Sequence, residues 1–546
     1  CVAAARSAGY ALDGGAAAAS FRRSLLAGTG LAGPGGSPAA RRDTLSIAQA
    51  MGLVANARFP TVRVLHTTDF HGALLPGARE RGSGRAVGGS AVLAAWIARL
   101  RAENPEGTIL LDGGDAFQGT MISNLQFGRP VVEQMNLLGY GGFAVGNHDL
   151  DWSADTLERR VDEMRFAALG ANLLERRTGR MPRWVRGDTV LTRRGVRVGL
   201  LGLAYTGTPR VTLASHVAPL RFDDDSATAA RLVPALRRRA RPHVVIGLGH
   251  TPGGLDSAGR VTGDLGRLAR VPGVDLWTGG HSHNRLLAEE GAATVMISGA
   301  QGQVVGLCDL TVDPLAGRVV ERRARLVPTY ADEVTPDSAM LARVAGWNAR
   351  VALLAATVIG RNARTLTRSR DGESPLGDLV ADAMRAESGA DLAFTNSGGL
   401  RADLAEGTIT RGAVYDVIPF DNTLVLVRLT GRQVRELLED GLAHGRISQQ
   451  SGLRYRFDLS RPRDGRLLAV TLADGSPLDE ARTYTVAVNN FMASGGDNYD
   501  TLARAGGQTD TGTLVREALE RHLAALTRDG PLDVRVDGRI ENAGRP

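Results

Sequence analysis

The stretch GGFAVGNHDLDW, residues 141–152, decides the expected fold, because a short apolar run ends there in a cluster of polar side chains. The run at 143–145 stops at a glycine, and four polar side chains then follow within five positions: Asn147, His148, Asp149 and Asp151. A bounded apolar run is typical of a buried strand. Amide, imidazole and carboxylate groups are typical of metal ligands and acid/base catalysts. The stretch therefore predicts a strand with a functional site at its carboxyl end.

The chain around this stretch alternates short apolar runs with helical patterns from Thr61 onward. The expected strands are 62–66, 108–115, 142–149, 196–204, 243–251, 274–283 and 294–300, and the expected helices include 88–103, 129–139 and 154–164. Strands that alternate with helices predict an α/β layered fold. Two later runs, 304–313 and 317–327, have no helix between them and predict a hairpin.

A chain of 546 residues is too long for one typical domain. The segment TPDSAMLARVAGWNARVALLAA, residues 335–356, predicts one long helix that connects two domains. The sequence thus predicts a first domain over 61–334 and a second, smaller α+β domain over 357–540.

The first 57 residues differ from the rest, being rich in alanine and glycine. An arginine pair precedes a weakly apolar run in both FRRSLLAGTGLAG (21–33) and RRDTLSIAQAMGLVANA (41–57). This pattern indicates an export signal and a periplasmic or secreted protein. The alternative is a disordered extension. No run of 18 apolar residues occurs, so we expect no membrane-spanning helix.

Composition excludes several classes of protein. The formal charge is +7 and the sequence contains no lysine, so all of its positive side chains other than histidine are arginine. No basic stripe with interleaved aromatics is present, and we expect no nucleic-acid partner, although the charge weakly favours anionic substrates. Only Cys1 and Cys308 occur, which excludes a disulfide framework and a cysteine-based metal cluster. The oligomeric state is not indicated.

Polar side chains follow several of the expected strands at the point where each strand ends. They are Asp69, His71, Asp115, Asn147, His148, His250, His281 and His283. The carboxyl ends of strands in an open α/β sheet gather along one edge, where ligands bind. A single histidine at such a place is usually structural, but five of the ten histidines lie there beside Gly or Asp. Together they favour a site.

The residue types indicate the kind of site. Imidazole and carboxylate ligands without cysteine suit Zn, Mn, Co or Fe. These candidate ligands are more than one ion can coordinate, so the sequence predicts two divalent metal ions. Two ions about 3.5–4 Å apart clamp the attacking and leaving oxygens of an in-line displacement.

The order Asp-x-His, Gly-Asp, Gly-Asn-His-Asp, Gly-His and Gly-His-x-His resembles that of calcineurin-like dinuclear metallophosphoesterases. Further along, NSGGLRADLAEGTI (396–409), VIPFDNTLVLVRLTG (417–431) and NNFMASGGDNYD (489–500) resemble the substrate domain of 5′-nucleotidases and UDP-sugar hydrolases. The likeness runs from about Val62 to about Leu502. It implies a layered β-sandwich flanked by helices, followed by a smaller α+β substrate-binding domain.

The resemblance also implies roles for individual residues. A first ion would be held by Asp69, His71 and His283, a second by Asn147, His250 and His281, and Asp115 would bridge both. His148 would be the catalytic histidine, and Asp151 its orienting carboxylate. Family members often carry Glu where this chain has Asp149, which receives no role.

The second domain would recognise the substrate. Phe420 and Phe491 match two aromatics that sandwich a nucleobase, and Arg370 and Arg401 match arginines that contact phosphate. Arg368 lies two residues from Arg370, and either could serve. The remaining matches are polar substrate contacts: Asn396, Asn422 and Asp497.

The resemblance implies a 5′-nucleotidase-like hydrolase in which a metal-activated water attacks a nucleoside 5′-monophosphate directly. Three alternatives stay open. One is a 2′,3′-cyclic nucleotide phosphodiesterase or UDP-sugar hydrolase of the same family. Another is a related thiohydrolase of sulfur oxidation, against which the two aromatics argue. The last is a secreted nucleotide-binding protein without catalysis, although all seven ligand positions are filled.

Overall fold

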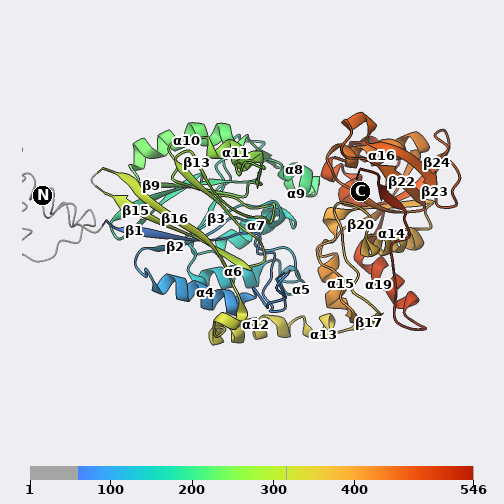
Figure 1. Cartoon of the computed structure of the whole chain (residues 1–546), viewed down its shortest axis with the longest axis horizontal. Helices are drawn as coiled ribbons and strands as arrows, with labels where there is room; N and C mark the ends of the chain where they lie inside the picture. Colours follow the sequence, from blue (N-terminus) through green and yellow to red (C-terminus); the bar gives the residue numbers. More distant parts are fainter. Residues whose placement is uncertain (1–58, 81, 315, 545–546) are drawn as a thin grey trace, which may run out of the picture.

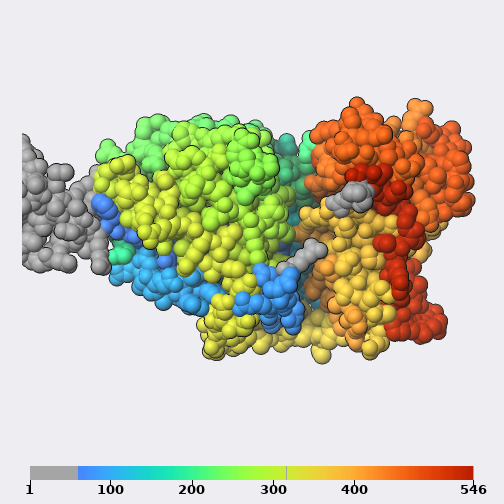
Figure 2. All heavy atoms as spheres, in the orientation of Figure 1, coloured from blue at the N-terminus to red at the C-terminus, as the bar shows by residue number. Residues whose placement is uncertain are grey.

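Two domains lie side by side in the computed structural model, which describes residues 59–80, 82–314 and 316–544 (Figure 1). Figure 2 shows them as adjacent lobes in the same orientation. The expected export signal at 1–57 falls outside the described residues. Within the ranges that are described, no helix is both long and apolar enough to cross a membrane.

Two six-stranded sheets form the N-terminal domain. The first has the order β16 (Arg318–Pro328), β15 (Val304–Asp313), β1 (Thr61–Thr67), β2 (Thr108–Asp112), β3 (Gly142–Ala144) and β4 (Ala167–Leu169). The second has the order β13 (Arg285–Glu290), β14 (Ala293–Ser298), β12 (Leu276–Thr278), β9 (Val244–Gly249), β7 (Val196–Leu203) and β6 (Asp188–Arg193). The predicted hairpin is confirmed, because β15 and β16 pair antiparallel.

The sheets pack face to face around one apolar layer, which confirms the predicted sandwich. Val64 and Leu111 of the first sheet share this buried cluster with Leu200, Ile246 and Leu276 of the second. β1, β2, β3 and β4 run parallel, as do β7, β9, β12 and β14. Their carboxyl ends therefore lie along one edge of the sandwich.

Helices cover both outer faces, giving an α/β/β/α order (Figure 1). Apolar residues of α4 (Ser90–Ala102) and α6 (Arg129–Leu138) pack against the first sheet, and those of α10 (Asp225–Ala240) and α11 (Gly263–Ala269) against the second. Shorter elements in this domain are α5 (Met121–Asn124), the 3-10 turn η2 (His148–Leu150), α7 (Ala154–Asp162), β5 (Leu173–Glu175), α8 (Thr208–Val211), α9 (Ala214–Val217), β8 (Leu220–Phe222), β10 (Gly254–Leu255), β11 (Val261–Thr262) and η3 (Ala331–Glu333).

The connector differs from the expectation of one long helix over 335–356. It forms two helices, α12 (Ser338–Ala349) and α13 (Ala352–Ala355), which lie below both domains in Figure 1. The helix is interrupted at Val351, whose backbone leaves the helical region at φ −123° and ψ −12°. The side chain of Val351 is buried in the core of the N-terminal domain. Burial of this β-branched side chain takes precedence over continuous helical hydrogen bonding.

A five-stranded mixed sheet organises the C-terminal domain. Its order is β21 (Ser448–Ser451), β18 (Leu392–Asn396), β24 (Thr483–Asn489), β20 (Thr423–Thr430) and β25 (Thr509–Leu514). Apolar residues of α14 (Pro375–Ser388) and α19 (Val515–Leu526) pack on one face, and those of α16 (Gly431–Ala443) on the other. The sequence predicts a helix over 510–526; the helix forms from Val515 as α19, but residues 509–514 pair with β20 instead.

Smaller elements complete this domain. They are β17 (Val358–Asn362), η4 (Ser397–Gly399), β19 (Gly407–Thr410), α15 (Arg411–Val417), β22 (Leu453–Phe457), η5 (Arg463–Gly465), β23 (Leu467–Leu472), α17 (Asn490–Ala493), η6 (Gly496–Asn498), α18 (Asp500–Arg504) and β26 (Ile540–Asn542). Mixed sheets with packed helices confirm the predicted α+β class for the second domain.

Candidate active site

The predicted metal ligands come together at the carboxyl edge of the sandwich, in two groups. Asp69, His71 and His283 form one group, and Asp115, His250 and His281 form the other. Within each group the potential ligand atoms lie within 4.8 Å of one another. These residues follow β1, β2, β9 and β12 directly, so the parallel strands deliver them to one place.

In the first group Asp69 and His71 are buried, whereas the side chain of His283 is 33% exposed. Asp69 Oδ1 lies 3.3 Å from His283 Nε2, and His71 Nε2 lies 3.1 Å from the same atom. His71 Nδ1 donates to the carbonyl of Gln118 at 2.8 Å, which turns its Nε2 toward the group. Asp69 Oδ2 accepts from the hydroxyl of Thr68 at 2.7 Å.

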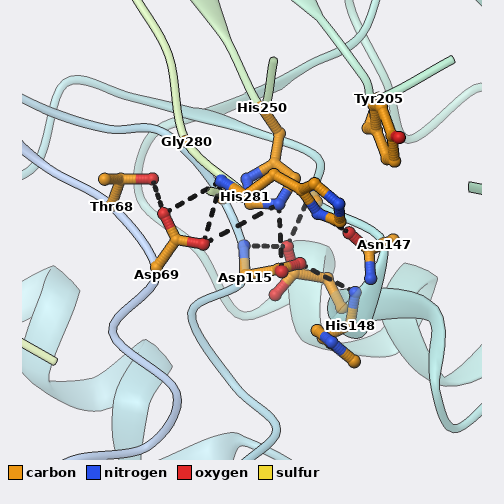
Figure 3. A network of polar contacts seen from close by, with 12 residues as sticks. Thr68, Asp69, Asp115, Asn147, His148, Tyr205, His250, Gly280 and His281 are labelled. Atoms are coloured by element: carbon orange, nitrogen blue, oxygen red, sulfur yellow. Dashed lines mark hydrogen bonds and ion pairs between the residues drawn. The ribbon is translucent and has the colours of Figure 1, made fainter. Parts of the chain in front are cut away.

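The second group surrounds Asp115, as Figure 3 shows. Asp115 Oδ2 lies 3.0 Å from His250 Nε2, and Asn147 Oδ1 lies 2.8 Å from His281 Nδ1. His250 Nδ1 donates to the carbonyl of Gly113 at 2.7 Å. Among the described residues, Asn147 Nδ2 is buried and has no hydrogen-bond partner. A histidine whose far nitrogen donates to a backbone carbonyl, so that its near nitrogen faces a carboxylate, is typical of a metal site.

Backbone strain is concentrated in the same residues. Five of the seven predicted ligands have positive φ: Asp69 (52°), His71 (51°), Asp115 (54°), His281 (66°) and His283 (56°). A non-glycine residue in the left-handed region is uncommon, and clusters of such residues are typical of functional sites.

Asp149, to which the sequence assigned no role, holds the loops that carry the ligands. Its Oδ2 accepts from the backbone N–H groups of Asp115 at 2.9 Å and Gly146 at 2.8 Å, and its Oδ1 accepts from Ala116 at 2.9 Å and Phe117 at 3.4 Å. Its side chain is buried. One carboxylate thus joins the loop after β2 to the loop after β3.

His148 and Asp151 form the pair that the resemblance implies. His148 Nδ1 lies 2.7 Å from Asp151 Oδ2, and the backbone N–H of His148 donates to Asp115 Oδ1 at 2.7 Å. Burial acts to lower the pKa of His148, but the carboxylates of Asp151 and Asp115 outweigh it and raise the pKa above the ordinary value. The pair therefore holds the imidazole by Nδ1 and leaves Nε2 turned away from Asp151.

A cavity of about 800 Å³ opens over this edge, and both domains line it. The predicted site residues in its wall are Asp115, Asn147, His148, Asp151, His281, His283, Arg370, Asn396, Arg401, Phe420, Asn422, Phe491 and Asp497. The other three, Asp69, His71 and His250, are buried beside it. The structure therefore brings every predicted site residue to one place.

The C-terminal domain reaches close to the candidate metal ligands. Arg401 Nη2 lies 3.3 Å from His71 Nε2, and the ring of Phe420 lies 5.4 Å from that of His148 between centroids. Burial lowers the pKa of Arg401 to about 10, and neighbouring Arg370 adds to this effect. At that pKa the guanidinium remains positively charged near neutral pH.

The ambiguity between Arg368 and Arg370 has a structural answer. Arg368 Nη1 donates to the backbone carbonyls of Leu400 and Arg401, whereas Arg370 is exposed and lines the cavity. Arg370 is therefore the one free to meet a ligand in the cavity.

Direct hydrogen bonds join the domains around the cavity. Asn124 Nδ2 donates to the carbonyl of Pro419 at 2.9 Å, and Arg210 Nη1 donates to Asn498 Oδ1 at 2.5 Å. These bonds hold Phe420 and Asp497 opposite the ligand groups.

Two residues near the site escaped the sequence reasoning. Tyr205, directly after β7, packs on the ring of His281 with centroids 4.2 Å apart (Figure 3). The strand-end rule that found the histidines would also have found Tyr205. Arg446 pairs with Asp497, whose other carboxylate oxygen accepts from Asn396 at 2.8 Å. No sequence pattern marks Arg446.

A two-sheet sandwich with Asp, Asn and His ligands after parallel strands defines the class of calcineurin-like phosphoesterases. The family described as calcineurin-like phosphoesterase matches residues 62–285, and the 5′-nucleotidase C-terminal domain family matches residues 352–504. The solved structure of a 5′-nucleotidase precursor from Thermus thermophilus has a TM-score of 0.81 and 30% identity, covering 89% of this chain and 100% of that one. The chain belongs to the 5′-nucleotidase family of metallophosphoesterases, as the sequence motifs predicted.

Two curated relatives match most of this chain at a lower sequence identity. The 5′-nucleotidase of Diplobatis ommata is 27% identical, with 93% of this chain and 94% of the relative covered. Protein UshA of Escherichia coli is 26% identical, with coverage of 87% and 92%. The chain also matches two longer Bacillus subtilis relatives, Endonuclease YhcR at 26% and the trifunctional nucleotide phosphoesterase protein YfkN at 27% identity, and spans 38% and 35% of their lengths.

Replacing Asp149 with Asn should disturb both stability and the ligand loops. The amide keeps one acceptor oxygen and brings an NH₂ group against backbone N–H donors, so we expect a loss of about 1.5–3 kcal/mol in unfolding free energy. Metal content at a fixed metal concentration should fall as well. Chemical denaturation and elemental analysis would measure the two effects.

Asp275→Asn is the matched control, because Asp275 Oδ2 also accepts a backbone N–H, from Val245 at 2.9 Å, but at the far end of β9. It should lower stability and leave metal content unchanged. Equal metal content in both variants would show that Asp149 does not organise the ligands.

Proposed function

We propose that this protein is a metal-dependent phosphohydrolase that releases phosphate from nucleoside 5′-monophosphates. The observation that carries the proposal is the shared cavity: two ligand groups from one domain face two aromatic rings and two arginines from the other. Under this proposal, residues 61–334 perform the chemistry and residues 357–540 select the nucleoside.

The ligand groups suit two divalent ions. Their donors are imidazole nitrogens, carboxylate oxygens and one amide oxygen, which fits Zn, Mn, Co or Fe. The hydrogen bond from His250 Nδ1 to the Gly113 carbonyl supports the assignment, because it turns Nε2 toward the carboxylate of Asp115. We propose that Asp69, His71 and His283 hold one ion, that Asn147, His250 and His281 hold the other, and that Asp115 bridges them. Such ions, when bound, activate water as a nucleophile and neutralise phosphate oxygens.

His148 serves as the proton donor in this proposal. Asp151 occupies its Nδ1, so the proton on Nε2 is directed away from the carboxylate and is available to the leaving oxygen. Arg401 and Arg370 would balance the negative charge of the phosphate, since a guanidinium fork matches a pair of anionic oxygens.

The nucleoside would be held at the other end of the cavity. Phe420 and Phe491 would stack on the base, and Asn422 would contact the base edge. Asp497 would contact the ribose, and Asn396 would make a further polar contact to the substrate. Asn489 Nδ2 donates to Asn396 Oδ1 at 3.0 Å, which fixes the amide.

Export is part of the proposal. It rests on the two arginine pairs that precede weakly apolar runs within residues 1–57. Expressed with these residues, the protein should be recovered outside the cytoplasm with a newly processed N-terminus, and a version without them should stay inside. Intact, unprocessed cytoplasmic protein would contradict export.

Activity should depend on metal and on Asp115. Phosphate release from AMP should disappear on chelation and return with Mn, Co or Zn. Asp115→Asn should lower metal content and turnover together, because it removes a carboxylate charge next to the ions. His148→Ala is the matched comparison: it should cut turnover strongly while metal content persists, since His148 is not a proposed ligand.

A substrate panel separates the alternatives within the family. We expect AMP to be hydrolysed faster than UDP-glucose, a 2′,3′-cyclic nucleotide or p-nitrophenyl phosphate. Preference for the cyclic nucleotide or UDP-glucose would replace the 5′-nucleotidase assignment, and binding without any hydrolysis would contradict the proposal altogether.

Phe420→Ala should separate nucleotide recognition from the chemistry. Stacking on a base is worth about 1–3 kcal/mol, so kcat/KM for AMP should fall by roughly 5- to 150-fold. Hydrolysis of p-nitrophenyl phosphate, which has no nucleobase, should change little. Equal losses on both substrates, measured under the same metal conditions, would exclude the stacking role.

A further inference from the structure

Gln118 is a buried amide in the cavity wall whose polar atoms have no partner. It follows β2 in the loop that begins with Asp115, its side chain is only 1% exposed, and it lines the cavity between the domains. Neither Oε1 nor Nε2 forms a hydrogen bond within the described residues.

An unpaired buried amide calls for an explanation. Burying polar atoms without hydrogen bonds opposes folding, and most buried polar side-chain atoms in native proteins are paired. Gln118 borders a cavity rather than closed core, so a molecule that enters the cavity can provide the missing partner.

The loop fixes Gln118 beside the first ligand group. Its carbonyl accepts from His71 Nδ1 at 2.8 Å, and the opposite nitrogen of the same ring lies 3.3 Å from Arg401 Nη2. The next residue, Gly119, is pressed so closely on His71 that an added Cβ would lie 2.2 Å from its carbonyl oxygen. The backbone at Gln118 is therefore held in place before any ligand arrives.

The group expected at this place is an acceptor of hydrogen bonds. Arg401 brings positive charge to the same ligand group, which suits an anionic oxygen. The NH₂ of an amide donates to such an oxygen without adding charge and does not titrate.

We propose that Gln118 is a phosphoryl-binding residue, whose Nε2 donates to an oxygen of the phosphate group being released. The inference rests on the proposed phosphohydrolase function and adds a neutral contact to the charged ones. Its Oε1 would accept a hydrogen bond from a water molecule that enters with the substrate.

Two variants test the contact. Gln118→Glu keeps the length of the side chain and places a negative charge against phosphate, and Gln118→Met keeps the approximate shape without hydrogen-bonding groups. Gln126→Glu is the matched control, because Gln126 lies in the same domain and does not line the cavity. Calorimetric titration of the metal-loaded proteins with inorganic phosphate and with adenosine provides the readout, and elemental analysis gives the metal content.

We expect phosphate affinity to fall at least about tenfold in Gln118→Glu and about three- to tenfold in Gln118→Met. Adenosine affinity and metal content should match those of the unaltered protein, and Gln126→Glu should bind phosphate normally. Unchanged phosphate affinity in Gln118→Glu would overturn the inference, as would a parallel loss of metal or of adenosine binding.

The measurement is independent of the proposed substrate. If the protein binds phosphate through Gln118 but does not hydrolyse AMP, the nucleotidase assignment fails and the inference stands. If AMP is hydrolysed and Gln118→Glu binds phosphate normally, the inference fails alone.

Discussion

The buried carboxylate of Asp149 is the interaction on which the site depends. Four backbone N–H groups from two loops converge on its two oxygens. The loops follow neighbouring parallel strands, β2 and β3, and each carries a proposed metal ligand, Asp115 or Asn147. Sheet geometry alone brings such loops to the same edge, but it does not fix their separation. A single carboxylate that accepts from N–H groups of both loops fixes their separation, and thereby the positions of the proposed ligands.

Under the proposed function, each domain would recognise one part of the nucleotide with a different kind of side chain. The first contributes imidazoles and carboxylates from rigid strand ends, and the second contributes aromatic rings and guanidinium groups. Neither set lines the whole cavity by itself. Because Arg401 reaches His71 and Phe420 lies beside His148, the charged and apolar ends of a nucleotide would meet at the interface between the domains. The bonds from Asn124 and Arg210 across this interface maintain that arrangement.

The sequence pattern predicted the alternation of strands and helices, the hairpin of β15 and β16, and the gathering of polar side chains at one edge, because each depends on local pattern and on parallel strand topology. The sandwich and the division of the ligands into two groups came instead from the resemblance to metallophosphoesterases. The sequence pattern missed features that depend on tertiary contacts. The role of Asp149 has no sequence signature, since three of its four partners are backbone N–H groups 32 to 34 residues away. The break at Val351 arises because one side chain is buried in the first domain, and residues 509–514 form β25 because β20 offers a free edge. Arg446 was missed because its ion-pair partner, Asp497, lies 51 residues further along the chain.

Five of the proposed ligands have a left-handed backbone conformation, and this limits how stable the protein can become. Each such residue opposes folding by an amount on the order of 1 kcal/mol or more, and glycine would remove most of that strain. Glycine, however, has no side chain with which to bind an ion. The domain therefore retains conformations that make it less stable than its well-packed core would permit, which is a trade-off between thermostability and function. Attempts to raise its melting temperature should leave these five backbone positions untouched and act on the two outer helical layers instead.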